Sequence, residues 1–153
     1  MAYEIRQYKE ADGREGPAFS AGIWRKGSNV GTVWNDGNGS SNRYDFRSPE
    51  EEKAFTAAAK VFAPLKTFEP EDAFIEELIV RRERQRYATR VAKKGSPIAV
   101  EVVVETNRFL PGVPEKVRYI AGIEEKDLRA WLATHKHVSA ARILSDGSLG
   151  PAL

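Results

Sequence analysis

Cysteine is absent from this chain of 153 residues, and its absence excludes several kinds of site. Without a thiol the protein has no disulfide framework, no thiolate zinc site and no cysteine nucleophile. The same absence fits a reducing, intracellular setting. A chain of this length buries roughly two thirds of its unfolded surface on folding, so we expect neither a metal ion nor a disulfide to be needed for stability.

Long hydrophobic runs are missing as well. No apolar stretch approaches the roughly 20 residues that a transmembrane helix needs. The first residues, Met1 to Arg6, have neither the basic-then-apolar order of a secretion signal nor the amphipathic character of a transit peptide. We therefore expect a soluble protein of the cytoplasm, or of the host cytoplasm if it is encoded by a phage, with no membrane partner.

The chain also lacks a strong charge of either sign. Its 24 basic and 22 acidic residues give a net charge of +2, and a division after Phe68 leaves a small positive excess on both sides. Neither part has the overall positive field of a strong nucleic-acid binder. Any electrostatic recognition must therefore be local.

Hydrophobic periodicity predicts an α+β fold in which mainly antiparallel sheet packs against three helices. The predicted strands cover residues 2–8, 18–25, 29–35, 43–46, 98–105, 116–121 and 139–144. The predicted helices begin at Pro49, Pro70 and Glu124 and end near Pro64, Ala92 and Thr134. The first has the clearest start, because Ser48 precedes Pro49 and stands three residues before Glu51, which is the pattern of a capping box.

We expect one domain, 1–153, with two subregions: 1–63 in the order βββ(β)α and 70–145 in the order αββαβ. Residues 9–16 are predicted to form a loop and 146–153 a tail. In the second subregion one face of the sheet is predicted to carry Ile98, Val100, Val102, Val104, Val117 and Tyr119. The other face is predicted to carry ion pairs of Glu101 and Glu105 with Lys116 and Arg118.

A loop rich in glycine, asparagine and serine, Asp36 to Asn42, is the first candidate site. Such residues let backbone N–H groups converge on an anion, but the phosphate-loop and dinucleotide patterns are absent. A calcium loop would need glycine where Ser41 stands and glutamate where Arg47 stands. A plain hairpin loop and a ligand-contacting loop both stay open.

The second half of the predicted helix from Pro70 is strongly basic, with a net +6 over the fourteen residues 81–94. Arg82, Arg86 and Arg90 are spaced i, i+4, i+8 and continue the helix side that Ile75 and Ile79 begin. In the first interpretation these arginines are structural: their aliphatic stems cover apolar surface and their charges pair with nearby carboxylates. Contact with phosphate is the second interpretation, since the guanidinium fork suits phosphate oxygens. An acidic protein partner is the third.

The predicted hairpin tip at 106–115 carries three apolar residues where polar ones are usual: Phe109, Leu110 and Val113. The tip either folds back over the core or forms an exposed contact surface, through which the chain would bind a partner or a second copy of itself.

Two histidines, His135 and His137, are the only ones in the chain, and no third ligand stands near them in sequence. We therefore predict no metal site, no histidine-based triad and no cofactor. A serine in a nucleophile-elbow pattern is also absent. The protein is predicted not to be an enzyme.

The segment from Gly22-Ile-Trp-Arg-Lys-Gly through Asn35-Asp-Gly-Asn-Gly to Asn42-Arg-Tyr44 resembles an opening module of small, uncharacterised phage and prophage proteins. The resemblance covers residues 22–46 and transfers no catalytic residue. It implies an accessory protein that inhibits host machinery, for instance host defence, by binding it or by sequestering a nucleotide signal.

The sequence thus predicts a non-enzymatic binding protein for an anionic ligand, a nucleotide or a nucleic-acid phosphate. The predicted ligand contacts are charge from Arg82, Arg86 and Arg90, polar groups from Asn38, Asn42 and Arg43, and stacking on Trp24, Trp34 or Tyr44. One alternative is a protein–protein inhibitor that contacts a host protein through the 106–115 tip. Another is a DNA- or RNA-binding module.

Overall fold

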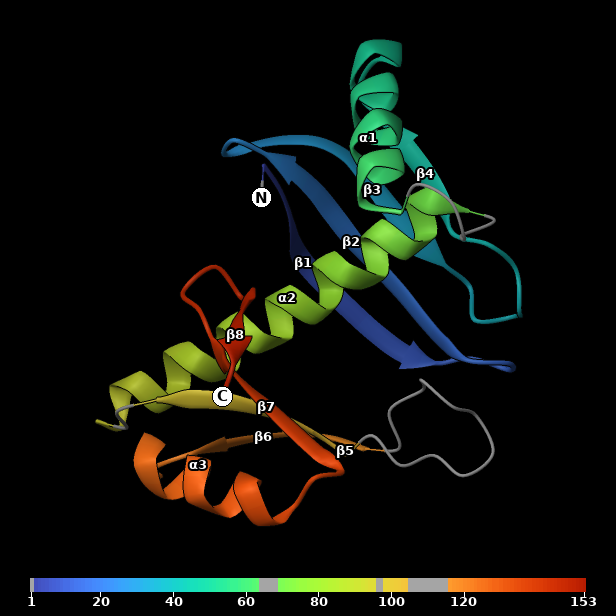
Figure 1. The fold of residues 1–153 in the computed structure, drawn as a ribbon. Coiled ribbons are helices and arrows are strands. Elements are labelled where there is room, and N and C mark those ends of the chain that lie inside the picture. Colours follow the sequence, from blue (N-terminus) through green and yellow to red (C-terminus); the bar gives the residue numbers. More distant parts are fainter. Residues whose placement is uncertain (1, 64–68, 96–97, 105–115) are drawn as a thin grey trace. The chain divides into compact units, whose positions relative to one another are not determined.

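A computed structural model describes residues 2–63, 69–95, 98–104 and 116–153 (Figure 1). The predicted α+β fold is confirmed: the described residues form two four-stranded antiparallel sheets and three helices. The chain divides into two compact units, Met1–Val80 and Arg81–Leu153. The boundary falls inside α2 (Pro70–Lys93), and each unit has its own sheet and its own hydrophobic core.

The sheet of the first unit has the order β1-β2-β3-β4, formed by Tyr3–Asp12, Pro17–Arg25, Ser28–Asn35 and Arg43–Phe46. Lys26 and Gly27 connect β2 to β3 with φ angles of 50° and 80°, the positive values that tight two-residue hairpins require. The prediction of a loop at 9–16 was wrong for residues 9–12, which continue β1. A bulge at Gln7, with φ of 56°, shifts the register, and every side chain from 9 to 12 is exposed. The sequence therefore has no hydrophobic alternation at 9–12 from which the end of β1 could have been predicted.

Two helices pack on one face of this sheet: α1 (Pro49–Phe62) and the first half of α2 (Figure 1). The predicted cap of α1 is confirmed, since the Glu51 amide donates to the Ser48 hydroxyl at 3.2 Å. The centre of the core is the fully buried ring of Phe55, whose centroid lies 5.2 Å from that of Tyr3 and 5.3 Å from those of Phe46 and Phe74.

The sheet of the second unit has the order β6-β5-β7-β8, formed by Lys116–Ala121, Ala99–Val104, Val138–Ile143 and Leu149–Ala152. The predicted tail at 146–153 is therefore wrong for 149–152, which pair with β7. Asp146 makes the turn before this strand by accepting the Ser148 amide at 2.9 Å. A four-residue strand that contains glycine and proline has too little hydrophobic alternation to be recognised.

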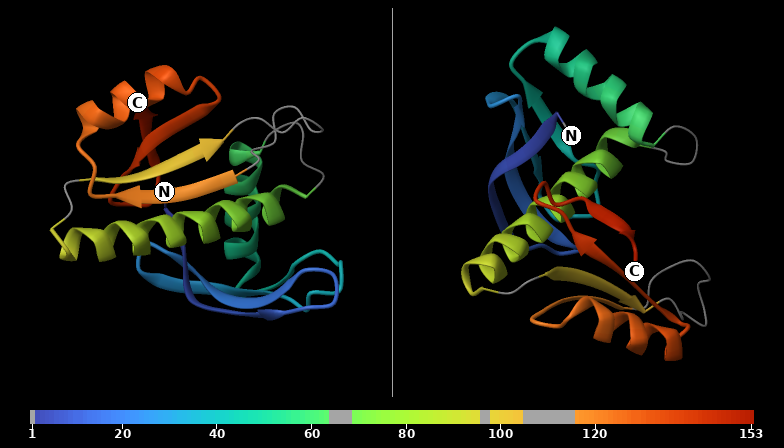
Figure 2. Two further views of the ribbon diagram at one scale, coloured as in Figure 1. Left: turned by 90° about the horizontal axis from the view of Figure 1, so that it is seen from below. Right: turned by 60° about the vertical axis from the view of Figure 1, so that its left-hand side comes forward.

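The strands of the second unit lie between α3 (Glu125–Thr134) and the second half of α2 (Figure 2). Leu128 of α3 packs on Val100 and Ala140 on one face of the sheet. On the other face, two side chains of α2, Arg84 and Tyr87, contact the strands.

The predicted face of β5 agrees with the core cluster, which contains Ile98, Val100 and Val102, whereas the predicted face of β6 was wrong by one residue. Glu101 stands opposite Tyr119, and Val102 stands opposite Arg118. Because side chains alternate along a strand, this register places Tyr119 on the same face as Glu101 rather than with Val102. Glu101 is only 5% exposed and pairs with Arg84, not with Arg118 as predicted. Its predicted companion, Glu105, lies outside the described residues.

Candidate ligand-binding site

The base of the candidate site is a buried ion pair between α2 and β5. Arg84 Nε lies 2.7 Å from Glu101 Oε2, and Arg84 Nη2 lies 3.1 Å from Glu101 Oε1. The two side chains are only 12% and 6% exposed. A two-pronged contact of this kind fixes direction as well as distance, so it sets how α2 rests on the strands.

Two tyrosines lie beside this pair. Tyr119 is the neighbour of Glu101 across the β5–β6 ladder, and its ring centroid lies 5.2 Å from that of Tyr87 on α2. Burial raises the pKa of both phenols above the ordinary value. For Tyr119 the charges of Glu101 and then Glu83 raise the pKa further. Both hydroxyls therefore stay protonated at neutral pH, and the rings form an uncharged aromatic surface.

A shallow pocket of about 380 Å³ opens over these rings, a volume within the usual range for small-molecule sites. We call it the tyrosine–arginine pocket, and its lining residues are Glu83, Arg86, Tyr87, Arg90 and Tyr119. Four of the five lie on α2 at i, i+3, i+4 and i+7, which places them along one side of the helix. The fifth comes from β6, the edge strand of the sheet.

Two cations of the pocket have no carboxylate partner. The side chains of Arg86 and Arg90 are exposed, and within the part of the chain that the structure describes neither forms an ion pair. The Arg90 guanidinium lies 5.4 Å from the Tyr87 ring centroid, within the range of a cation–π contact. Positive charge is thus held next to an aromatic surface.

Arg82, the third predicted arginine, lies about one turn before Arg86, is half-buried and is not among the residues that line the pocket. The structure therefore brings together two of the three predicted arginines. It adds Tyr87, Tyr119 and Glu83, which sequence reasoning did not assign. Tyr87 directly follows Arg86, and its place beside the predicted arginines could have been predicted from helical spacing alone. Tyr119 was hidden by the error in the β5–β6 register.

The second predicted group, in the loop 36–42, belongs to the first unit, so neither unit by itself contains both groups. The Asp72 carboxylate at the start of α2 accepts one hydrogen bond from the backbone N–H of Asn42 at 3.1 Å and one from the Tyr44 hydroxyl at 2.5 Å. The Asn42 side chain accepts from Asn35, and the Asn38 side chain accepts the Ser40 amide. These polar groups bond inside the unit, so a ligand would compete with existing hydrogen bonds.

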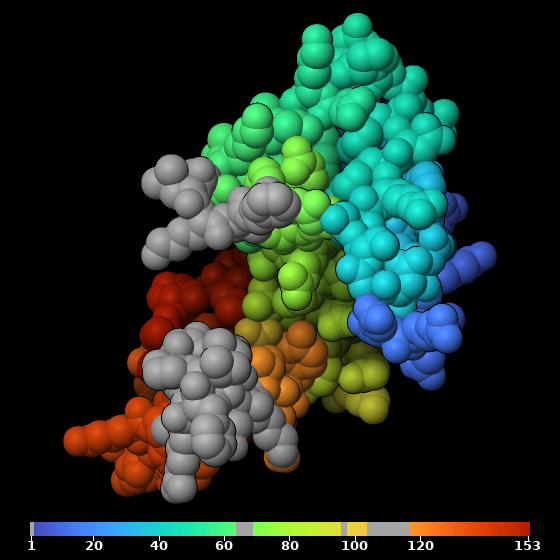
Figure 3. Space-filling model, turned by 90° about the vertical axis from the view of Figure 1, so that its right-hand side faces the viewer, coloured from blue at the N-terminus to red at the C-terminus, as the bar shows by residue number. Residues whose placement is uncertain are grey.

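The loop also packs against the turn between β1 and β2 (Figure 3). The Glu15 amide donates to the Gly37 carbonyl at 2.8 Å. A methyl group on Gly37, whose φ is 71°, would lie 2.7 Å from the Gly13 Cα atom. Only glycine permits this backbone approach, which gives the glycine content of the loop a structural reason.

Three further predicted residues lie on the face of the first sheet that points away from its core. Trp34 is half-buried and stands opposite Arg43, whose side chain is exposed and 3.9 Å from Asp36. The ring of Trp24 is covered by the Arg6 guanidinium at 4.2 Å. Since Arg6 already occupies the Trp24 ring, a base would have to displace it.

The hydrogen bond between Tyr44 and Asp72 predicts how the contribution of Tyr44 to folding stability depends on pH. Burial, and then the hydrogen bond to Asp72, raise the pKa of Tyr44 far above its ordinary value. Above about pH 10 the unfolded chain loses this phenolic proton while the folded chain keeps it. Folding stability from Tyr44 is therefore fully present below that pH and falls as the pH rises.

We expect Tyr44→Phe to destabilise the protein by about 1–3 kcal/mol at pH 8, because it removes a hydrogen bond to a carboxylate. The difference in the free energy of unfolding between this variant and the wild type should be smaller at pH 11. Urea unfolding at the two pH values measures both effects. Tyr8→Phe is the matched control, since the Tyr8 hydroxyl donates to the exposed carboxylate of Glu10. Equal results for the two variants would contradict the assignment.

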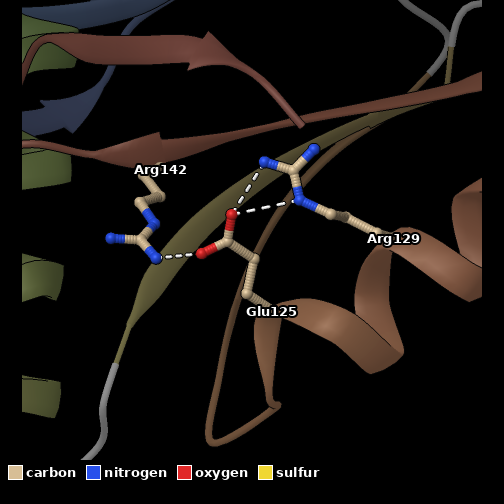
Figure 4. A network of polar contacts seen from close by, with 3 residues as sticks. All are labelled: Glu125, Arg129 and Arg142. Atoms are coloured by element: carbon tan, nitrogen blue, oxygen red, sulfur yellow. Dashed lines mark hydrogen bonds and ion pairs between the residues drawn. The ribbon is translucent and has the colours of Figure 1, made fainter.

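Another polar network ties α3 to β7 (Figure 4). The Glu125 carboxylate accepts from Arg129 at 2.8 Å and from Arg142, and hydrogen bonds first from Arg129 and then from Arg142 lower its pKa. Every charge in this network has a partner and is partly exposed. It supports the fold and offers no free binding group.

The predicted absence of a metal site was tested only on the described residues, where no three side chains of histidine, aspartate or glutamate gather closely enough to hold an ion. The His135 ring instead stacks on Trp131 at 4.0 Å. None of the helices in the described ranges is long and apolar enough to cross a membrane. The tip residues Phe109, Leu110 and Val113 lie outside the described residues, so contact through the tip stays a prediction.

Comparisons with protein-family models, curated proteins and solved structures gave no significant match to this chain. The resemblance of residues 22–46 to phage accessory proteins therefore stays a prediction.

Proposed function

We propose that the protein binds a small anionic ligand with an aromatic ring, such as a nucleotide, in the tyrosine–arginine pocket. The observation that carries this proposal is the pair Arg86 and Arg90, two cations without carboxylate partners beside the adjacent, mutually tilted rings of Tyr87 and Tyr119. Arginine suits phosphate because its fork presents two donors to two oxygens. Tyrosine rings suit a base because every base has a π-face.

The internal pairing of Arg84 supports this division of roles. Arg84 is buried against Glu101 and holds the helix to the sheet, whereas Arg86 and Arg90 extend into solvent at the pocket. The basic segment thus combines both interpretations of the sequence: one arginine pairs with a carboxylate, and two remain available for an anion. Together with the resemblance to phage accessory proteins, the proposed function is sequestration of a nucleotide rather than its conversion.

The test is binding of nucleoside 5′-monophosphates, measured by calorimetry on the full chain. We expect Arg86→Ala/Arg90→Ala to weaken binding by roughly a hundredfold or more, because each lost hydrogen bond to a charged group costs about 1.5–3 kcal/mol. Lys93→Ala/Lys94→Ala is the matched control, since it removes two positive charges from the end of the same helix but leaves the pocket lining intact.

Two outcomes would overturn the proposal: no binding of any nucleotide at millimolar concentration, or equal losses in the two double variants. A nucleic-acid ligand would give a third pattern, in which a single-stranded oligonucleotide binds more tightly than any mononucleotide and its affinity falls steeply with salt. The pocket volume favours the single nucleotide.

A further inference from the structure

The tyrosine–arginine pocket contains a carboxylate as well as two guanidinium groups. We infer that Glu83 selects the base of the bound nucleotide and that the selected base is guanine. This inference rests on the proposed function, because it assigns a role to one end of the same pocket.

The positions along α2 separate the two kinds of charge. Glu83 lies seven residues before Arg90, and a rise of 1.5 Å per residue places the two about 10 Å apart along the helix axis. Arg86 and Tyr87 lie between them. The pocket therefore has its carboxylate at one end, Arg90 at the other, and Arg86 with the aromatic rings in the middle. A nucleotide whose phosphate lies between the two arginines would direct its base edge toward Glu83.

The Glu83 carboxylate is available for a ligand. Among the described residues it forms no hydrogen bond or ion pair, although Arg86 follows it at i+3 and its charge acts on the Tyr119 phenol. A carboxylate next to a phosphate site repels the phosphate. It is useful there only if the other end of the ligand presents hydrogen-bond donors to it.

Guanine is the base with the matching edge. Its N1–H and exocyclic N2–H₂ are adjacent donors, so both can meet the two oxygens of one carboxylate. Adenine and cytosine present one amino group next to a ring nitrogen that only accepts, and uracil presents one N–H between two carbonyls. A carboxylate facing any of these three bases would meet at least one acceptor, and that mismatch carries the cost of an unpaired polar group.

The experiment compares GMP, IMP and AMP on the full chain by calorimetry. We expect GMP to bind roughly ten- to a hundredfold more tightly than AMP, which corresponds to one charge-assisted hydrogen bond. IMP lacks the exocyclic amine and should fall between the two. Glu83→Gln should reverse the order in favour of AMP, because an amide accepts from the adenine amino group and donates to the adjacent ring nitrogen.

Glu76→Gln is the control, since Glu76 is an exposed glutamate of the same helix outside the pocket. It should leave the preference for GMP unchanged. Binding that depends on Arg86 and Arg90 but is equal for the three nucleotides would overturn the guanine inference and leave the proposed function intact. Absence of all nucleotide binding would overturn both.

Discussion

Neutralising Glu101 alone is expected to destabilise the protein by about 3–5 kcal/mol, because Glu101→Gln removes the carboxylate that both prongs of the largely buried Arg84 guanidinium contact. Glu101 and Arg84 are only 6% and 12% exposed, and both oxygens of the carboxylate accept from the guanidinium. Water cannot replace the lost partner at such a site. Since a typical domain is stable by only about 5–15 kcal/mol, this one change would remove a large part of the total.

Urea unfolding at pH 7 measures the effect, with Arg84→Met as the reciprocal variant. The double variant Arg84→Met/Glu101→Leu should recover most of the loss, because it removes both buried charges and replaces them with apolar groups. Arg129→Gln is the control: its ion pair with Glu125 is largely exposed, and its loss should change stability much less. Equal effects of Glu101→Gln and Arg129→Gln would show that the Arg84–Glu101 pair is not desolvated.

The same ion pair connects stability to the candidate site. Glu101 is the ladder neighbour of Tyr119, and Arg84 lies one turn of α2 before Tyr87 and Ala88. The two tyrosines meet only if the helix keeps its position on the strands. Loss of the pair is therefore expected to weaken the proposed nucleotide binding, even though neither Arg84 nor Glu101 lines the pocket.

The elements that the sequence predicted well are those with a local cause. The capping sequence at Ser48 placed the start of α1, because the hydroxyl and the amide that it accepts are only three residues apart. The turn at Lys26-Gly27 placed the β2–β3 hairpin for the same reason. The α+β class followed from these elements and from the helical spacing of apolar residues in α1 and α2.

The candidate site was only partly predictable, because it depends on a pairing register. Helical spacing identified Arg86 and Arg90, which belong to one element. Tyr119 required the register of β5 and β6, because a shift of one residue moves its side chain to the opposite face, where Glu101 lies. Glu101 was also hidden by its type, since a glutamate on a strand is usually exposed and its burial needs a partner from a distant part of the chain.

Truncation of Phe55 is the second change with a large expected effect. Phe55→Ala should destabilise the first unit by about 3–5 kcal/mol, the usual range for a fully buried phenylalanine. The Phe55 side chain is completely buried and contacts aromatic rings from β1, β4 and α2. Three separate elements would lose contacts at once, and the surrounding rings are too rigid to fill the space.

The measurement is urea unfolding in a Trp131→Phe background, where the remaining tryptophans, Trp24 and Trp34, both report on the first unit. Phe55→Leu should cost clearly less, because it keeps most of the apolar volume. Val61→Ala is the surface control on the same helix: Val61 is 83% exposed, and its truncation should stay within about 0.5 kcal/mol. If Phe55→Ala behaved like Val61→Ala, that result would contradict the burial of α1 against the sheet through Phe55. No other contact of α1 places so large a side chain at the centre of that core.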